Sequence, residues 1–155
     1  MEHNESEVRS SVAILNTLLG AELSAESTYR NILAKAEGEK LASVFYKIHK
    51  DHVETRDLLS TKVEELGGIP LQQATTWKGI SFLTESSSHP LSDPTAIKAL
   101  REGEEQAVLT YESTLLDRDI DSNLRNLIET KLLPMAKRHI PVLEAALASQ
   151  ASSIY

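Results

Sequence analysis

Six carboxylate and imidazole side chains occupy positions at which apolar residues would be expected in a helical protein. They come from four separate stretches of the chain and comprise Glu22, Glu26, His49, His52, Glu104 and His139. Carboxylate oxygens and imidazole nitrogens bind zinc, iron, manganese and copper in proteins. The sequence therefore predicts a metal site for one or two divalent ions, made from some subset of these six residues.

The first two glutamates lie in the middle of an apolar stripe. Alternating steps of four and three residues trace one helix face, which carries Val8, Val12, Leu15, Leu19, Glu22, Glu26, Tyr29, Leu33 and Ala36. Burial of an ionised carboxylate costs several kcal/mol unless a cation, a metal ion or strong hydrogen-bond donors compensate it. Glu22 and Glu26 must therefore meet partners from elsewhere in the chain.

Four helices are expected to position these side chains. Helical periodicity, together with glycine and proline breaks, predicts them over 7–37, 39–66, 94–118 and 122–149. Short breaks join the helices in two antiparallel hairpins, and the long segment 67–93 between the hairpins can cross the whole bundle. The predicted fold is an all-α four-helix bundle, with 1–155 as a single domain.

The second expected helix carries the candidate partners of the two glutamates. Its inward stripe is polar in the middle, where His49 and His52 lie with Arg56 nearby. An antiparallel hairpin that turns around Gly38 places Glu26 level with His49. The same alignment places Glu22 level with His52 and Arg56.

The second hairpin repeats this arrangement. Glu104 interrupts the apolar stripe of the third expected helix. His139 lies in the middle of the inward stripe of the fourth, between Met135 and Val142. Antiparallel alignment places the two within one turn of each other. Pro134 and Pro141 both lie inside the fourth helix, so we expect kinks or a local break there.

Composition excludes several kinds of site and partner. The 155 residues contain no cysteine, which excludes disulfides and thiolate metal sites. The formal net charge of −7 argues against nucleic acid and anionic membranes as partners, because both require clustered Lys and Arg. The sequence has no signal-peptide pattern and no apolar run near the ~18 residues of a membrane span, so we expect a cytoplasmic protein.

Four segments resemble the ferritin-like superfamily: AESTYRNILAKAEG (25–38), HVETRDLLSTKVEELGG (52–68), REGEEQAVLTYESTL (101–115) and LIETKLLPMAKRH (127–139). In both hairpins a tyrosine follows a glutamate by seven residues, as Tyr29 follows Glu22 and Tyr111 follows Glu104, which looks like ferritin and rubrerythrin. Within the superfamily, the whole chain resembles a small bacterial four-helix-bundle family of unknown function. The resemblance implies that Glu22 and Glu104 are terminal carboxylates of two metal half-sites.

The chain departs from the superfamily at two bridging carboxylates. Di-iron members carry Glu-x-x-His on two helices, but here the residue three before His52 is His49, and the residue three before His139 is Ala136. Two iron ions held close together need several anionic oxygens to offset their charge. The departure argues against ferroxidase chemistry and more strongly against iron storage.

Two hypotheses follow for the polar residues in the middle of the bundle. In the first they bind iron, zinc, manganese or copper. In the second the protein is a structural or interaction bundle without metal, Arg56 is the counter-ion of Glu22, and the histidines hydrogen-bond the remaining carboxylates. No nucleophile–base triad or phosphate-binding loop is visible, so no catalytic residue is predicted. Because superfamily bundles often associate through helix faces, a homo-oligomer is expected, with a dimer favoured.

Overall fold

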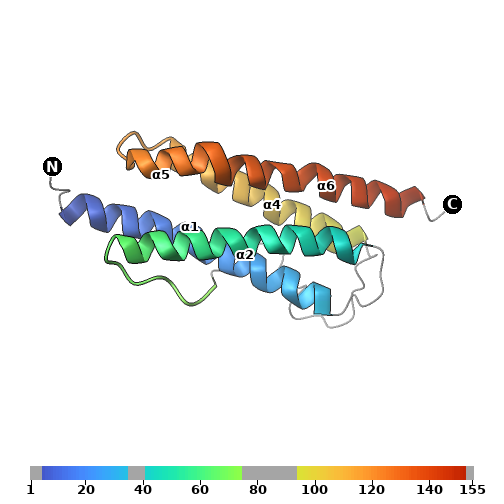
Figure 1. The fold of residues 1–155 in the computed structure, drawn as a ribbon. Helices are drawn as coiled ribbons and strands as arrows, with labels where there is room; N and C mark the ends of the chain where they lie inside the picture. Colours follow the sequence, from blue (N-terminus) through green and yellow to red (C-terminus); the bar gives the residue numbers. More distant parts are fainter. Residues whose placement is uncertain (1–4, 35–40, 75–93, 153–155) are drawn as a thin grey trace.

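The computed structural model describes residues 5–34, 41–74 and 94–152, most of which are helical. The helices are α1 (Glu5–Ala34), α2 (Ala42–Glu65), α4 (Pro94–Leu115), α5 (Ser122–Leu127), the π-helical η1 (Ile128–Leu132) and α6 (Leu133–Ser152). α5, η1 and α6 follow one another without a gap and form the fourth long helix of the bundle (Figure 1). The predicted all-α four-helix bundle is confirmed.

Two antiparallel hairpins make up the bundle. α1 packs chiefly against α2, and α4 packs chiefly against α6. α2 ends at one end of the bundle and α4 begins at the other, so these two helices run in the same direction (Figure 1). The predicted connection 67–93 therefore joins opposite ends of the bundle, although 75–93 lies outside the described residues.

The helix limits differ slightly from the predicted ones. α1 begins at Glu5, and α6 continues to Ser152. α4 ends at Leu115 instead of Arg118, and the Arg125 guanidinium donates to the carbonyl oxygens of Leu115 (3.1 Å) and Asp117 (2.8 Å). These bonds satisfy carbonyl groups that the end of a helix leaves unpaired. The predicted helix ends around Gly38 lie outside the described residues.

A glycine pair ends α2 and directs the chain back onto α1. Gly67 adopts a φ of 81°, in the left-handed region that favours glycine, and the Gly68 N–H donates at 2.9 Å into the last turn of α2. The following residues are held by Asn16 of α1. Its side-chain amide donates to the Ile69 carbonyl oxygen at 3.1 Å and accepts the Leu71 N–H at 2.9 Å.

The fourth helix departs from α-helical geometry directly before Pro134. The Leu133 N–H donates to the carbonyl oxygen of Ile128, one residue further back than in an α-helix, and η1 is the result. Proline has no N–H to donate, so the turn before it is free to widen. The predicted distortion is therefore confirmed before Pro134, whereas helix α6 continues unbroken through Pro141.

The core consists of two apolar clusters with a polar layer between them. One cluster includes Tyr29, Phe45, Ile97, Leu100 and Leu143, and the other includes Leu15, Leu19, Leu59, Ile128 and Leu132. Along α1, α2 and the fourth helix, a buried polar residue separates the members of the two clusters. Together with Glu104 of α4, these residues form the polar layer: Glu22, His52, Glu104 and His139, each at most 5% exposed.

The prediction is wrong for one expected core residue of the fourth helix. Val142 was expected to face inward but is 40% exposed, and Leu143 is fully buried instead. The inward face steps four residues from His139, not three, because a helix turn contains 3.6 residues and the stripe must alternate between the two steps.

Candidate metal centre

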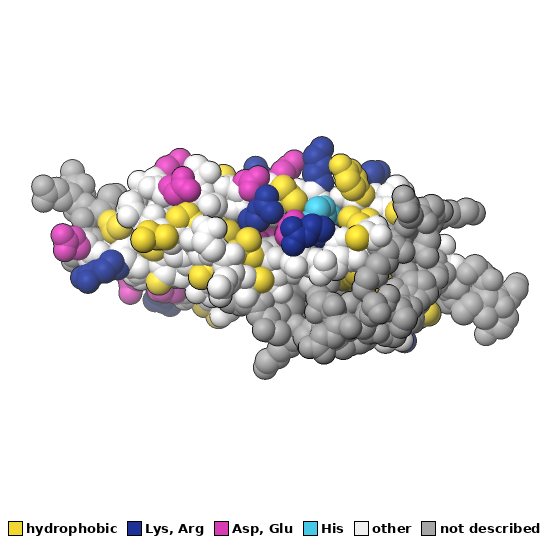
Figure 2. All heavy atoms as spheres, turned by 90° about the horizontal axis from the view of Figure 1, so that it is seen from below, with side chains coloured by type: hydrophobic (Ala, Val, Ile, Leu, Met, Phe, Trp, Pro, Cys, Tyr) yellow, Lys and Arg dark blue, Asp and Glu magenta, His cyan; other side chains and the backbone are white. Residues whose placement is uncertain are grey.

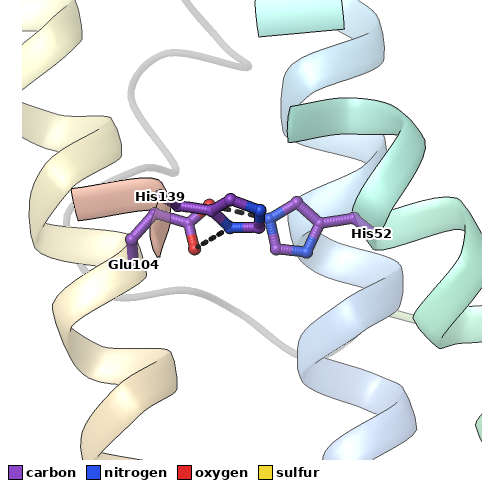
Figure 3. A group of neighbouring side chains, drawn as sticks. All are labelled: His52, Glu104 and His139. Atoms are coloured by element: carbon purple, nitrogen blue, oxygen red, sulfur yellow. Dashed lines mark hydrogen bonds and ion pairs between the residues drawn. The ribbon is translucent and has the colours of Figure 1, made fainter. Parts of the chain in front are cut away.

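Three helices bring two imidazoles and one carboxylate together in the polar layer. His52 comes from α2, Glu104 from α4 and His139 from α6, and all three point toward one another (Figure 3). His52 Nε2 lies 2.7 Å from Glu104 Oε1, and His139 Nδ1 lies 3.2 Å from Glu104 Oε2. One potential ligand atom from each residue lies within 4.8 Å of the other two. We call these three residues the central group.

The outer nitrogen of each imidazole contacts a further carboxylate. His52 Nδ1 lies 2.6 Å from Glu22 Oε2, and His139 Nε2 lies 2.8 Å from Asp51 Oδ2. Glu22 is buried, whereas the Asp51 side chain is 35% exposed. The network therefore extends from the dry interior of the bundle to its surface.

Two tyrosines hold the buried glutamates crosswise between the hairpins. The Tyr29 hydroxyl donates to Glu104 at 2.9 Å, and the Tyr111 hydroxyl donates to Glu22 at 2.7 Å. Each tyrosine thus contacts the glutamate of the other hairpin, not the one seven residues before it. Burial and the neighbouring glutamates raise the pKa of both tyrosines well above its usual value, so both hydroxyls keep their protons.

The carboxylates control the protonation of the rings. Burial alone would lower the pKa of His52, but the charges of Glu104 and Glu22 outweigh burial and raise that pKa well above its usual value. The pKa of His139 is raised as well, because its hydrogen bonds to Glu104 and Asp51 and the Glu104 charge outweigh burial and the charge of His52. Burial opposes ionisation of Glu104, but the two rings hold the pKa of its carboxyl well below the usual range. Without a metal ion, these contacts favour the imidazolium form of both rings and the carboxylate form of Glu104.

Glu26 belongs to a separate cluster at the edge of the polar layer. Its Oε1 lies 3.4 Å from His49 Nε2 and 3.5 Å from guanidinium nitrogens of both Arg30 and Arg56. We call Glu26, His49, Arg30 and Arg56 the Glu26 cluster. On the face of the molecule seen in Figure 2, a histidine lies beside Lys or Arg side chains. Glu26 itself is buried, so its cationic neighbours compensate the cost of its charge.

The predicted pairings are present, but one predicted ion pair is wrong. Glu22 contacts His52, Glu26 contacts His49, and Glu104 contacts His139, as hairpin alignment predicted. Arg56 was expected to be the counter-ion of Glu22, yet it pairs with Glu26 and Asp57.

The position of Arg56 has a physical reason. Both oxygens of Glu22 already have partners, because Oε1 accepts the Tyr111 hydroxyl and Oε2 contacts His52. The Arg56 side chain is 29% exposed, so its guanidinium keeps part of its hydration by pointing toward the surface.

Asp51 is the residue of this network that sequence reasoning missed. It lies beside the inward stripe of α2 and not on it, so helical periodicity gives no sign that it takes part. Its contact with His139 arises where α6 passes α2, which the alignment within each hairpin does not describe. Its position directly before His52 in the sequence was the available signal.

The residues present do not fit a carboxylate-bridged pair of iron ions. Such centres take a bridging carboxylate from each of two Glu-x-x-His motifs. In this structure the corresponding His49 contacts Glu26, and Ala136 is buried in the apolar cluster with no side-chain donor. Two imidazoles and a carboxylate remain, which is a donor set suited to a divalent transition metal.

Comparison with known proteins places the fold. No family model and no curated protein matches the chain. A ferritin-like diiron-carboxylate protein from Bacillus anthracis strain Ames is similar with a TM-score of 0.71 at 20% identity, over 95% of this chain and 99% of that one. A bacterioferritin from Rhodobacter capsulatus, with a metal-free dinuclear site and haem iron, is similar with a TM-score of 0.70 at 19% identity. The similarity covers 98% of this chain and 89% of that one. The chain therefore has the ferritin-like fold, and the resemblance seen in the sequence is confirmed at that level. Its narrower resemblance to a bacterial family of unknown function stays a prediction.

Proposed function

We propose that the bundle binds a divalent transition-metal ion at the central group, with His52, Glu104 and His139 as ligands. The proposal depends on one observation: ligand atoms from three helices converge within 4.8 Å in a layer from which water is largely excluded. The ferritin-like fold, shared with a diiron-carboxylate protein, supports it. The ion belongs to the group of iron, zinc, manganese and copper, all of which accept imidazole and carboxylate ligands.

The surrounding residues would orient these ligands. Histidines that bind metal usually donate their other N–H to a carboxylate, which fixes the tautomer and the ring orientation. Glu22 would be this carboxylate partner for His52, and Asp51 would be the partner for His139. The Tyr29 hydroxyl holds Glu104. An ion held there would supply a Lewis acid, and iron, manganese or copper would also supply a redox centre.

Glu26 and His49, two of the predicted ligands, are left out of the proposed ligand set. Both belong to the Glu26 cluster, in which two arginines already neutralise the carboxylate. This separation gives a matched pair of histidine variants. His139→Ala removes a proposed ligand, whereas His49→Ala removes an imidazole at the edge of the polar layer without touching the central group.

Metal analysis and thermal melting test the proposal. Protein purified without added metal is analysed for bound elements and melted with and without a chelator. Bound metal raises the melting temperature by linkage, with about 2.7 kcal/mol of added stability at a free ion concentration of 100 times Kd. The chelator effect should disappear in His139→Ala and persist in His49→Ala. Absence of metal, together with no change in melting temperature after addition of Fe²⁺, Zn²⁺, Mn²⁺ or Cu²⁺, would reject the proposal.

A metal-free structural network is the second candidate. It is favoured by the fact that every ring nitrogen of His52 and His139 already has a carboxylate partner. Buried ionic layers of this kind can fix the register of helices without adding much stability. Under this candidate, neither chelator nor added metal changes the melting temperature, and the wild-type protein contains no bound transition metal.

A further inference from the structure

We infer that the centre holds a single ion on two imidazoles and one carboxylate, and that the residues the structure describes leave no place for a second ion beside it. The inference rests on the proposed function and adds the stoichiometry and the class of centre. The class follows from the central group, and the stoichiometry follows from what occupies the neighbouring positions.

The central group is spaced for one ion. Two ligands on a metal with bonds of about 2.1 Å lie about 3.0 Å apart when they are at right angles and about 3.4 Å apart at the tetrahedral angle. The His52 nitrogen lies 2.7 Å from one Glu104 oxygen and the His139 nitrogen lies 3.2 Å from the other, and both distances are close to these separations. One ligand atom of each residue lies within 4.8 Å of the other two, so one ion could bind after side-chain adjustments that bring both rings to bonding distance.

A second ion lacks bridging oxygens on two helices. His49 and Ala136 lie one turn before His52 and His139, respectively, where a bridging carboxylate would have to originate. His49 is turned toward Glu26, and Ala136 carries only a methyl group that packs in the apolar cluster. Neither residue supplies an anionic oxygen to offset the charge of a second ion.

The Glu26 cluster offers no ligand to a second ion. Glu26 is the next carboxylate along α1 after Glu22, so it is the natural candidate for an additional ligand. The same oxygen of this carboxylate lies within 3.5 Å of guanidinium nitrogens of Arg30 and Arg56. Arginine stays charged at any ordinary pH, so these side chains neutralise Glu26 and repel a cation that approaches it.

Three protein ligands leave coordination positions open. Structural zinc sites are closed by four protein ligands, whereas catalytic zinc sites and mononuclear non-haem iron sites use three and keep positions for water or a small ligand. Two histidines and one carboxylate are the ligand set of such mononuclear centres. The structure therefore assigns the central group to the open, mononuclear class.

Manganese binding to the full chain tests the stoichiometry. The protein is loaded with Mn²⁺, desalted and analysed for metal content and by electron paramagnetic resonance. We expect one Mn²⁺ per chain, with the hyperfine spectrum of an isolated ion. Two ions per chain with an exchange-coupled spectrum would overturn the inference and leave the proposed function intact. If neither Mn²⁺ nor the other three metals binds, the proposed function fails and the inference fails with it.

A variant with two added carboxylates tests whether the missing carboxylates limit the centre to one ion. His49→Glu combined with Ala136→Glu supplies both missing carboxylates, and we expect the metal content to rise from one ion to two per chain. The control, Tyr46→Glu with Val142→Glu, adds the same acids at exposed positions of α2 and α6 and should stay at one ion. If the double variant keeps its helical fold but still binds only one ion, the missing carboxylates are not what limits the centre to one ion. Should the variant fail to fold, the wild-type measurement still decides the stoichiometry.

Discussion

Glu104 is the side chain on which the buried network converges. It is fully buried, and it contacts Tyr29, His52 and His139 from three other helices. An isolated carboxylate at this position would be strongly unfavourable, because burial removes its hydration. Its stability in the ionised form therefore comes from two rings and a hydroxyl, and these same contacts place its oxygens where an ion would bind.

Asp51→Asn tests whether the carboxylate that contacts the His139 ring contributes to metal affinity. Asparagine keeps the size of the side chain but loses the charge that holds the His139 ring. We expect metal affinity to fall by about 10–100-fold, the usual effect of changing an outer carboxylate. Isothermal titration with Zn²⁺ measures it. Glu54→Gln, an exposed change of the same kind on α2, should leave the affinity unchanged; equal affinities in the two variants would contradict the role of Asp51.

The metal-free protein should lose stability as the pH rises above neutral. The pKa of His52 is raised in the folded state by Glu22 of α1 and Glu104 of α4, against the opposing effect of burial next to Tyr29 and His139. A raised pKa contributes stability that is full below the unfolded value of about 6.5 and is lost as the pH rises through the folded value. Urea unfolding in chelator, measured at several pH values from 6 upward, should show this decrease. A rise in stability over that window would contradict the charged network.

At the level of the elements, most of the arrangement could be predicted from helical periodicity. The interruptions of the apolar stripes by Glu22, His52, Glu104 and His139 identified the polar layer. Antiparallel alignment then paired residues within each hairpin, because their heights along the helices are fixed by the rise per residue. Contacts between hairpins could not be predicted in this way. Tyr29 with Glu104 is one such contact, since it depends on how the two hairpins pack together.

Long and exposed side chains limited the rest of the prediction. Arg56 could reach either glutamate of α1, and sequence alone does not show that Tyr111 and His52 already satisfy Glu22. Solvent exposure also favours the pairing of Arg56 with Glu26, because the guanidinium stays partly hydrated when it points outward. Side-chain competition of this kind is a property of the folded structure, not of the spacing.

The end of α2 gives a test at the level of one element. Gly67→Ala should destabilise the protein by about 1–2 kcal/mol, because a residue with a Cβ is strained at positive φ. Apart from the adjacent residues of the chain, no atom in the described parts of the structure lies within 4 Å of the added methyl group, so the cost comes from the backbone. Gly67→Asn should cost less, since asparagine tolerates this conformation. Urea unfolding measures both, and equal stability of wild type and Gly67→Ala would contradict the backbone explanation.

At the level of the whole molecule, association of chains stays a prediction. No helix in the described parts of the chain is long and apolar enough to cross a membrane. Leu109 and Leu116 of the α4 region are 59% and 81% exposed, and both are apolar surface that a second chain could cover. Sedimentation at micromolar concentration should show a homo-oligomer, with a dimer expected. A monomer across that range would remove the prediction.

Anomalous X-ray diffraction from crystals of the metal-loaded protein tests the central claim most directly. Data collected at the absorption edge of the bound metal locate the ion independently of the protein atoms. A single anomalous peak within bonding distance of His52 Nε2, His139 Nδ1 and a Glu104 oxygen is predicted. An anomalous map with no peak in the polar layer, or with its peak at Glu26 and His49, would contradict the account.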